Sequence, residues 1–133
     1  MRDYARLQAA VLLRRLAFQV DRAAKLGDAD AVHDLRVALR RFSRCLRVFA
    51  QFFPERAWRK IRRDIAGLMD IAGAVRDCDM ALALLGEAGI RGSAGIAVRL
   101  DTERRKAGRE LSREIRRWQN SNFSRKWRSR LEL

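Results

Sequence analysis

The sequence has few of the residues that end helices or cross-link a chain. It contains one Pro, eight Gly and two Cys, and hydrophobic residues make up 48% of its 133 positions. Few helix-breaking residues beside a large hydrophobic fraction argue against disorder and for long helices. Two cysteines do not make a disulfide framework, so we expect Cys45 and Cys78 to be free thiols.

Long apolar runs and acidic residues are scarce as well. No run of about 18 apolar residues is present, and Arg14 and Arg15 interrupt the N-terminal apolar stretch, so we expect neither a membrane span nor a signal peptide. We therefore expect a cytoplasmic protein without a membrane partner. Asp and Glu number 16 against 30 Lys and Arg, which gives a formal net charge of +14. This excess favours an anionic partner but does not determine the fold.

Residues for catalysis or metal binding are equally few. His33 is the only histidine, so no pair of histidines can form a relay or a zinc site. Glycine-rich phosphate loops and the CxxC, HExxH and GxSxG motifs are absent. An RDxD element at Arg76, Asp77 and Asp79 could hold Mg²⁺ beside phosphates. Acids in the first turn of a helix are more simply caps, so we predict a structural motif that caps a helix and makes a salt bridge to the arginine-rich helix. We expect no catalytic residue, no metal and no cofactor.

Apolar residues at helical spacing predict an all-α fold, an antiparallel four-helix bundle with a break at the RDxD element. The length fits one domain over residues 1–133. We expect Gly27 to end the first helix, Asp28 or Asp30 to cap the second, Pro54 to end the second, and Gly73 to interrupt the third. The expected helices cover residues 3–26, 31–53, 55–72, 77–85 and 94–118, with a glycine-rich connector at 86–95. We expect a short final segment at 123–131 to be either a packed end or a contact for a partner.

The stretch from Val32 to Phe53 has two opposed faces. At about 100° per residue, apolar side chains occupy one side of the expected helix, and a basic face about 80° wide lies nearly opposite. Arg36, Arg40 and Arg44 repeat at i,i+4 without an intervening acid, although such like-charge pairs cost a few tenths of a kcal/mol each. A solvated surface would accept acids here, so the pattern favours a polyanion as the partner. The basic face consists of His33, Arg36, Arg40, Arg44 and Arg47.

A second basic patch follows Pro54. Arg56, Arg59, Lys60, Arg62 and Arg63 lie in one run without an acid, and antiparallel packing would bring this patch near the first. The helix expected at 94–118 is also basic, but acids at pairing distance are mixed with its bases. We interpret that face as solvated and internally paired.

The pair of segments HDLRVALRRFSRCLRVF and GAVRDCDMAL resembles the CHAD family, the conserved histidine α-helical domains. The resemblance is clear from Asp30 to Leu85 and looser elsewhere. An HxxRVxxRR pattern is matched by His33, Arg36, Val37, Arg40 and Arg41. A GxVRDxD pattern is matched by Gly73, Val75, Arg76, Asp77 and Asp79.

The resemblance implies an all-helical protein that binds inorganic polyphosphate through a basic surface or pore and gathers at polyphosphate granules. Carried over by position, it makes His33, Arg36, Arg40 and Arg41 ligand candidates, and Arg47 fits a downstream basic site. Where the family often has another base, this chain has a serine followed by Arg44. With the residues that charge alone selects, the candidate polyphosphate-binding set is His33, Arg36, Arg40, Arg41, Arg44, Arg47, Arg56, Arg59, Lys60 and Arg63.

The chain differs from the family in size, because family members usually carry two similar halves and this sequence has one. We therefore expect a homodimer in which a second copy supplies the missing wall. The leading hypothesis is non-catalytic polyphosphate binding. RNA or DNA backbone binding is the principal alternative, because the same charges attract any phosphate backbone. A phosphohydrolase or phosphotransferase has support only from the RDxD element.

Overall fold

Helices form nearly all of the computed structural model, which describes residues 1–92 and 94–133. The all-α prediction is confirmed. No strand occurs in these residues, whose elements are α1 (Arg2–Leu26), α2 (Ala29–Val48), the 3-10 turn η1 (Ala50–Phe52), α3 (Glu55–Glu87), α4 (Gly95–Asn120) and α5 (Phe123–Arg130).

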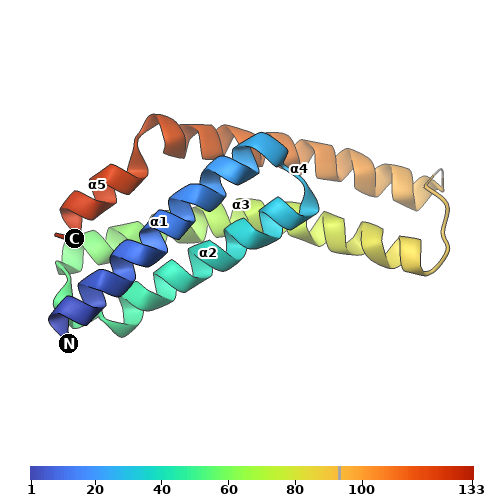
Figure 1. Cartoon of the computed structure of the whole chain (residues 1–133). Helices are drawn as coiled ribbons and strands as arrows, with labels where there is room; N and C mark the ends of the chain where they lie inside the picture. The colour runs from blue at the N-terminus through green and yellow to red at the C-terminus, as the bar shows by residue number, and fades with distance from the viewer. Residues whose placement is uncertain (93) are drawn as a thin grey trace.

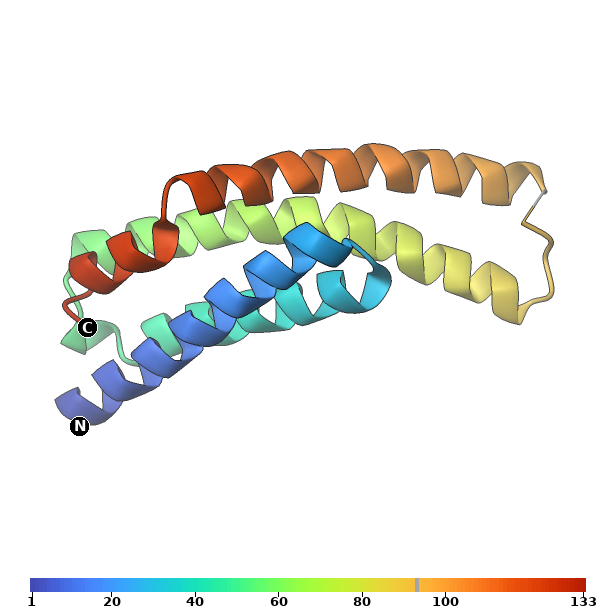
Figure 2. The ribbon, with the colours of Figure 1, turned by 45° about the horizontal axis from the view of Figure 1, so that its top comes forward.

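The four long helices run alternately up and down (Figure 1). Helix α1 packs against α2, α2 against α3, and α3 along α4, while the short α5 folds back toward α1 and α3. The C-terminal part of α3 and the N-terminal part of α4 project beyond the turn between α1 and α2 (Figure 2). Both chain termini lie at the opposite end of the molecule.

The core lies between α1, α2 and α3 and is closed by α4 and α5. Among the described residues, no polar or charged side chain is buried, so every cation lies at least partly at the surface. Burying one large aliphatic side chain stabilises the fold by about 1.5–3 kcal/mol. The largest fully buried side chains include Leu13, Leu16, Leu35, Leu39, Phe42, Leu46, Ile61 and Ile65.

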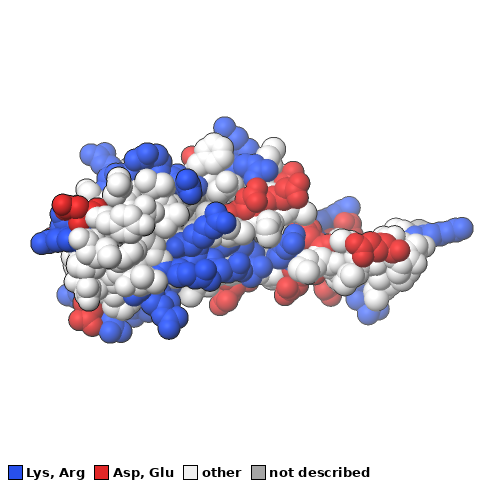
Figure 3. Space-filling view, turned by 60° about the horizontal axis from the view of Figure 1, so that its bottom comes forward, with Lys and Arg blue, Asp and Glu red and all other residues white. Residues whose placement is uncertain are grey.

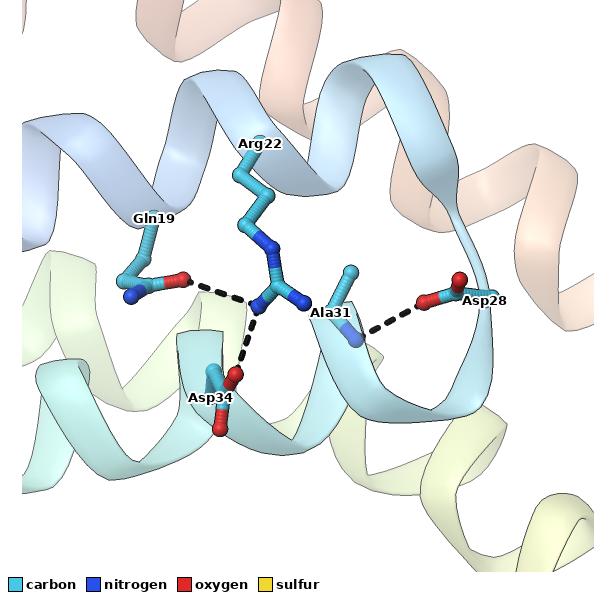
Figure 4. Close-up of polar contacts among 5 residues, drawn as sticks. All are labelled: Gln19, Arg22, Asp28, Ala31 and Asp34. Atoms are coloured by element: carbon cyan, nitrogen blue, oxygen red, sulfur yellow. Dashed lines mark hydrogen bonds and ion pairs between the residues drawn. The ribbon is translucent and has the colours of Figure 1, made fainter.

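The turn between α1 and α2 forms as the sequence predicts. Gly27 ends α1 in the left-handed region at φ 61°, where glycine carries no steric penalty. Asp28 caps α2, and its Oδ1 accepts a hydrogen bond of 2.9 Å from the Ala31 N–H (Figure 4). The cap satisfies one of the free N–H groups at the start of the helix.

Helix α2 ends earlier than predicted, at Val48 rather than at residue 53. Proline disfavours helical backbone in the residue before it, and Phe53 is accordingly extended at φ −121° and ψ 152°. Phe53 is buried, and the Phe49 ring meets Tyr4 of α1 at a centroid distance of 6.0 Å. The chain leaves the helix so that these aromatic side chains can pack.

The predicted break at Gly73 is wrong, because α3 runs unbroken from Glu55 to Glu87 and includes the separate helix expected at 77–85. Glycine inside a helix costs about 1 kcal/mol relative to alanine, which packing against α2 and α4 can offset. Gly73 also gives space to a side chain from α2. A Cβ at this position would lie 3.7 Å from the Arg36 Nη2 atom.

The RDxD element therefore lies inside a helix, and its predicted capping role is wrong. Asp79 makes a salt bridge, but with Arg104 of α4 and not with the arginine-rich α2. The Arg104 Nε donates to Asp79 Oδ1 at 3.0 Å, and its Nη2 donates to the Gly27 carbonyl oxygen at 2.6 Å. One guanidinium thus joins α3, α4 and the end of α1.

The C-terminal segment is a packed end, the first of the two predicted alternatives. Trp118, Phe123 and Trp127 form an aromatic cluster with centroid distances of 4.9–5.1 Å. Phe42 of α2 stacks on Trp127 at 6.0 Å, so α5 is fixed to the core. Of the predicted connector at 86–95, the first two residues belong to α3, and position 93 lies outside the described residues.

Candidate functional site

Arginines from two helices surround a groove between α2 and α3. The groove has a volume of about 350 Å³, and Ile65, Ala66 and Met69 of α3 line it together with Ser43 of α2. Figure 3 shows Lys and Arg side chains in a band across the body of the molecule. The cations that line the groove are Arg40, Arg44 and Arg47 of α2 and Arg62 of α3.

Helical spacing explains why these residues meet. Residues three or four apart share a helix face, which aligns the three arginines of α2 along the flank beside α3. On α3, Arg62, Ala66 and Met69 follow the same spacing on the facing flank. The Arg62 Nε donates to Ser43 Oγ at 3.1 Å, so its guanidinium is held toward α2.

The protein's own acids do not neutralise the groove arginines. Among the described residues, no carboxylate lies within 4.0 Å of a charged nitrogen of Arg40, Arg44, Arg47 or Arg62. Asp70 borders the groove without forming an ion pair. Asp34, the acid next to His33, faces α1 and pairs with Arg22 (Figure 4). The groove therefore keeps a positive potential that attracts anions.

Arg36 lies deeper than the other predicted arginines. Its side chain is half-buried, and the Nε atom is buried without a hydrogen-bond partner in the part of the chain that the structure describes. Its guanidinium lies beside Gly73 of α3. Arg36 thus connects the two helices, whereas His33 is exposed near the start of α2.

The remaining predicted residues are distributed over other surfaces. Arg41 lines a different groove, between α1 and α2, with Arg14 and Arg15. Arg59 pairs with Glu55 at 2.9 Å and lies 4.9 Å from the centre of the Trp58 ring. Arg56 is exposed. Lys60 and Arg63 line a cleft on the opposite side of α3, against α4 and α5.

Arg62 is the groove residue that the predicted set omits. The sequence places it in the basic run after Pro54, but charge alone does not distinguish it from its neighbours. The useful signal is its spacing from Ala66 and Met69, which puts it on the flank next to α2. That assignment requires knowing which side of α3 faces α2, and the structure supplies it.

Acidic and thiol groups do not form a reactive cluster. In residues 1–92 and 94–133, no three His, Cys, Asp or Glu side chains are placed to hold a metal ion. Burial raises the pKa of the Cys78 thiol, and the nearby carboxylates of Glu103 and Asp79 raise it further. Burial also raises the pKa of Cys45. Both cysteines are free, and none of the described helices is long and apolar enough to cross a membrane.

Comparison with known proteins gives one finding. The family model described as CHAD domain matches residues 7–132, nearly the whole chain. The chain belongs to the CHAD family. CHAD domains are known for polyphosphate-related binding and are generally binding rather than catalytic domains. Searches of curated proteins and of solved structures gave no match.

The two segments that carry the CHAD resemblance meet in space. The first lies on α2, and the second lies on α3. The Arg36 side chain of the first segment lies beside Gly73 of the second segment. Arg36 precedes Arg40, the first arginine of the groove, by about one helix turn. In this CHAD chain, the second segment therefore contacts α2 at Gly73, and its Asp79 forms a salt bridge with Arg104 of α4.

Proposed function

We propose that this CHAD chain binds inorganic polyphosphate, without catalysis, at the groove between α2 and α3. One observation carries the proposal: Arg40, Arg44, Arg47 and Arg62 line a single groove, and no carboxylate of the described residues pairs with them. The family adds support, because CHAD domains are known for polyphosphate-related binding.

The chemistry of the groove suits a linear phosphate chain. A guanidinium is a planar fork that can bind two phosphate oxygens at once. A hydrogen bond to a charged group contributes about 1.5–3 kcal/mol. At a rise of about 1.5 Å per residue, arginines three or four positions apart on α2 lie about 4.5–6 Å apart along the helix axis, which allows one extended phosphate chain to contact each of them. Affinity should fall as salt rises, because salt screens these charges.

The positions of the acids support binding rather than catalysis. Hydrolysis of a phosphoanhydride would be helped by acids that hold Mg²⁺ beside the groove. Among residues 1–92 and 94–133, Asp70 is the single carboxylate that lines the groove. Asp79 pairs with Arg104 on another side of α3. The absence of phosphate release from polyphosphate with Mg²⁺ present is the expected result, and release would contradict a purely binding role.

The test replaces the three α2 arginines of the groove together. Arg40→Gln, Arg44→Gln and Arg47→Gln should weaken long-chain polyphosphate binding about 1,000-fold, since each of the three lost charged contacts contributes about 1.4 kcal/mol or more. The control changes three arginines of α4 in the same way: Arg109, Arg113 and Arg116. Isothermal titration calorimetry gives the affinities, and circular dichroism checks helicity. An equal loss in the control would show that overall charge, not this groove, holds the ligand.

RNA or DNA is the alternative ligand of the same groove. A competition assay at physiological salt separates the two. We expect polyphosphate to remain bound when tRNA or duplex DNA is added at equal phosphate concentration. Ready displacement by tRNA would favour a nucleic-acid partner. Recruitment of the labelled protein to polyphosphate granules in cells would support the proposed location.

We also propose that a second copy of the chain completes the binding surface. Family members usually have two similar halves, and this chain has one. Apolar side chains are exposed on the projecting end of α3 and α4, including Met80, Leu84 and Ile96, and a partner could cover them. Two copies with this much positive charge repel each other unless an anion lies between them. Light scattering should therefore show a dimer when long-chain polyphosphate is added, and a bound but unchanged monomer would contradict dimerisation.

A further inference from the structure

Basic surface continues from the α2–α3 groove across the outer face of α3. Arg62 and Ala66 line both that groove and a second hollow of about 470 Å³, which is also lined by Arg59 and Arg63. Arg63 in turn lines the cleft of about 450 Å³ between α3 and the C-terminal helices. The second hollow therefore lies between the groove and the cleft, and shares Arg62 with the groove and Arg63 with the cleft.

The cleft on the far side of α3 is itself suited to an anion. Its five cations come from three helices. Lys60 pairs with Asp64 at 3.9 Å, and Arg117 pairs with Glu114 at 3.0 Å. No other ion pair in the described part of the chain involves the cleft, so three cations remain available to a ligand: Arg63, Lys126 and Arg130.

The outer face of α3 between the α2–α3 groove and the cleft carries only small side chains at the two exposed positions that follow Arg63. The next exposed positions on the outer face of α3 are Ala66 and Gly67, and a Cβ at Gly67 would meet no atom within 4 Å. Asp70 lies one turn further and limits the basic surface on that side. A helix with its side chains is about 10–12 Å across, so the path over α3 is on the order of 15 Å.

We propose that one polyphosphate chain occupies both the α2–α3 groove and the α3–α5 cleft, and crosses α3 over Arg62 and Arg63. The inference rests on the proposed function and adds a second anchoring surface, with Lys126 and Arg130 as binding residues. Two anchored segments of one chain raise the local concentration of each other, so affinity rises with chain length. Duplex DNA has a persistence length of about 150 base pairs and cannot bend around a single helix.

The central experiment compares short and long ligands on two matched variants. The cleft variant carries Lys126→Gln and Arg130→Gln, and both side chains are exposed, so folding should be unaffected. The control carries Arg109→Gln and Arg113→Gln on α4, an equal change of charge away from the path. Tripolyphosphate and long-chain polyphosphate are titrated into each protein at several salt concentrations. Tripolyphosphate, with three phosphoryl groups, is too short to bridge both surfaces.

In the cleft variant, we expect long-chain polyphosphate to bind about tenfold or more weakly. The slope of log affinity against log salt should become shallower by about 1.4, or about 0.7 for each of the two lost phosphate contacts. Tripolyphosphate binding at the α2–α3 groove should stay within about threefold of the original, as should both ligands in the control. Equal losses in the two variants would overturn the second anchor and leave the α2–α3 groove standing. If long-chain polyphosphate fails to bind the original protein, the proposed function and the inference are both wrong.

A second pair of variants tests the crossing itself. Gly67→Glu places a carboxylate on the path, and Gly67→Gln places a neutral side chain of similar size there. Open space surrounds this position, and both replacements favour helix over glycine, so both proteins should fold. We expect the Glu variant to bind long-chain polyphosphate several-fold more weakly than the Gln variant, with equal tripolyphosphate affinities. Equal long-chain affinities would exclude a path over this turn.

Discussion

Replacing Gly73 by alanine should stabilise the protein, because the glycine lies inside a continuous helix. Gly73 is in the middle of α3, which extends from Glu55 to Glu87. A glycine costs about 0.8–1.0 kcal/mol relative to alanine in a helix interior. The added Cβ would lie 3.7 Å from Arg36 Nη2, an ordinary contact distance that requires no movement. The net gain should be about 1 kcal/mol, or roughly 4 °C in Tm.

Gly67→Ala provides the matched control for this prediction. Gly67 also lies inside α3, but an added Cβ there meets no atom within 4 Å. Urea denaturation followed by circular dichroism measures the unfolding free energy of both variants. Equal gains would show that Arg36 accepts the extra methyl group without cost. A larger side chain, as in Gly73→Leu, must displace the Arg36 guanidinium and should lose the gain.

The two glycine variants also test whether α3 is continuous at Gly73. A break at Gly73 with left-handed backbone would make alanine unfavourable there by about 1–2 kcal/mol. Destabilisation by Gly73→Ala together with stabilisation by Gly67→Ala would therefore show that α3 is interrupted. The second family segment would then be a helix boundary, and the contact between Arg36 and α3 would need another explanation.

Two further predictions concern the junction of α3 and α4. Asp79→Asn should lower the unfolding free energy by about 2 kcal/mol, because it removes the charged partner of Arg104; a change below about 0.5 kcal/mol in urea unfolding would mean that the pair does not stabilise the junction. Burial and neighbouring carboxylates raise the pKa of Cys78, so less thiolate exists at neutral pH. The pH midpoint of its iodoacetamide reaction should therefore lie higher in the folded protein than in urea, measured on a Cys45→Ala background. Coinciding midpoints would contradict the raised pKa.

Local patterns predicted the parts of the fold that depend on helical spacing and caps. The apolar spacing of Leu35, Leu39 and Leu46 identifies the buried face of α2, because burial follows the helical period. Gly27 and Asp28 are the expected end and start signals, and both act so. These signals are carried by the residues themselves and need no knowledge of neighbouring helices.

The errors arose where packing between helices outweighs local preference. From the sequence alone, Gly73 is predicted to break the helix. In the structure α3 packs against α2 and α4 and continues through Gly73. The spacing of Phe49 from the other apolar residues predicts that α2 continues past it. In the structure α2 ends at Val48, and the Phe49 ring packs against Tyr4. Packing between helices also determines which groove each candidate residue lines. The sequence shows that Arg41 and Arg63 are basic, but it does not show which groove each of them lines.

The energetics of α2 explain how the protein can hold its arginines together before any ligand binds. The i,i+4 repulsions between Arg36 and Arg40 and between Arg40 and Arg44 together cost less than about 1 kcal/mol. On the opposite face, four large side chains, Leu35, Leu39, Phe42 and Leu46, are fully buried. At about 1.5–3 kcal/mol each, their burial exceeds the repulsion several-fold. A bound polyanion would remove the repulsion and bind only the folded state, so long-chain polyphosphate should raise Tm at low salt, and this increase should diminish as salt screens the charges.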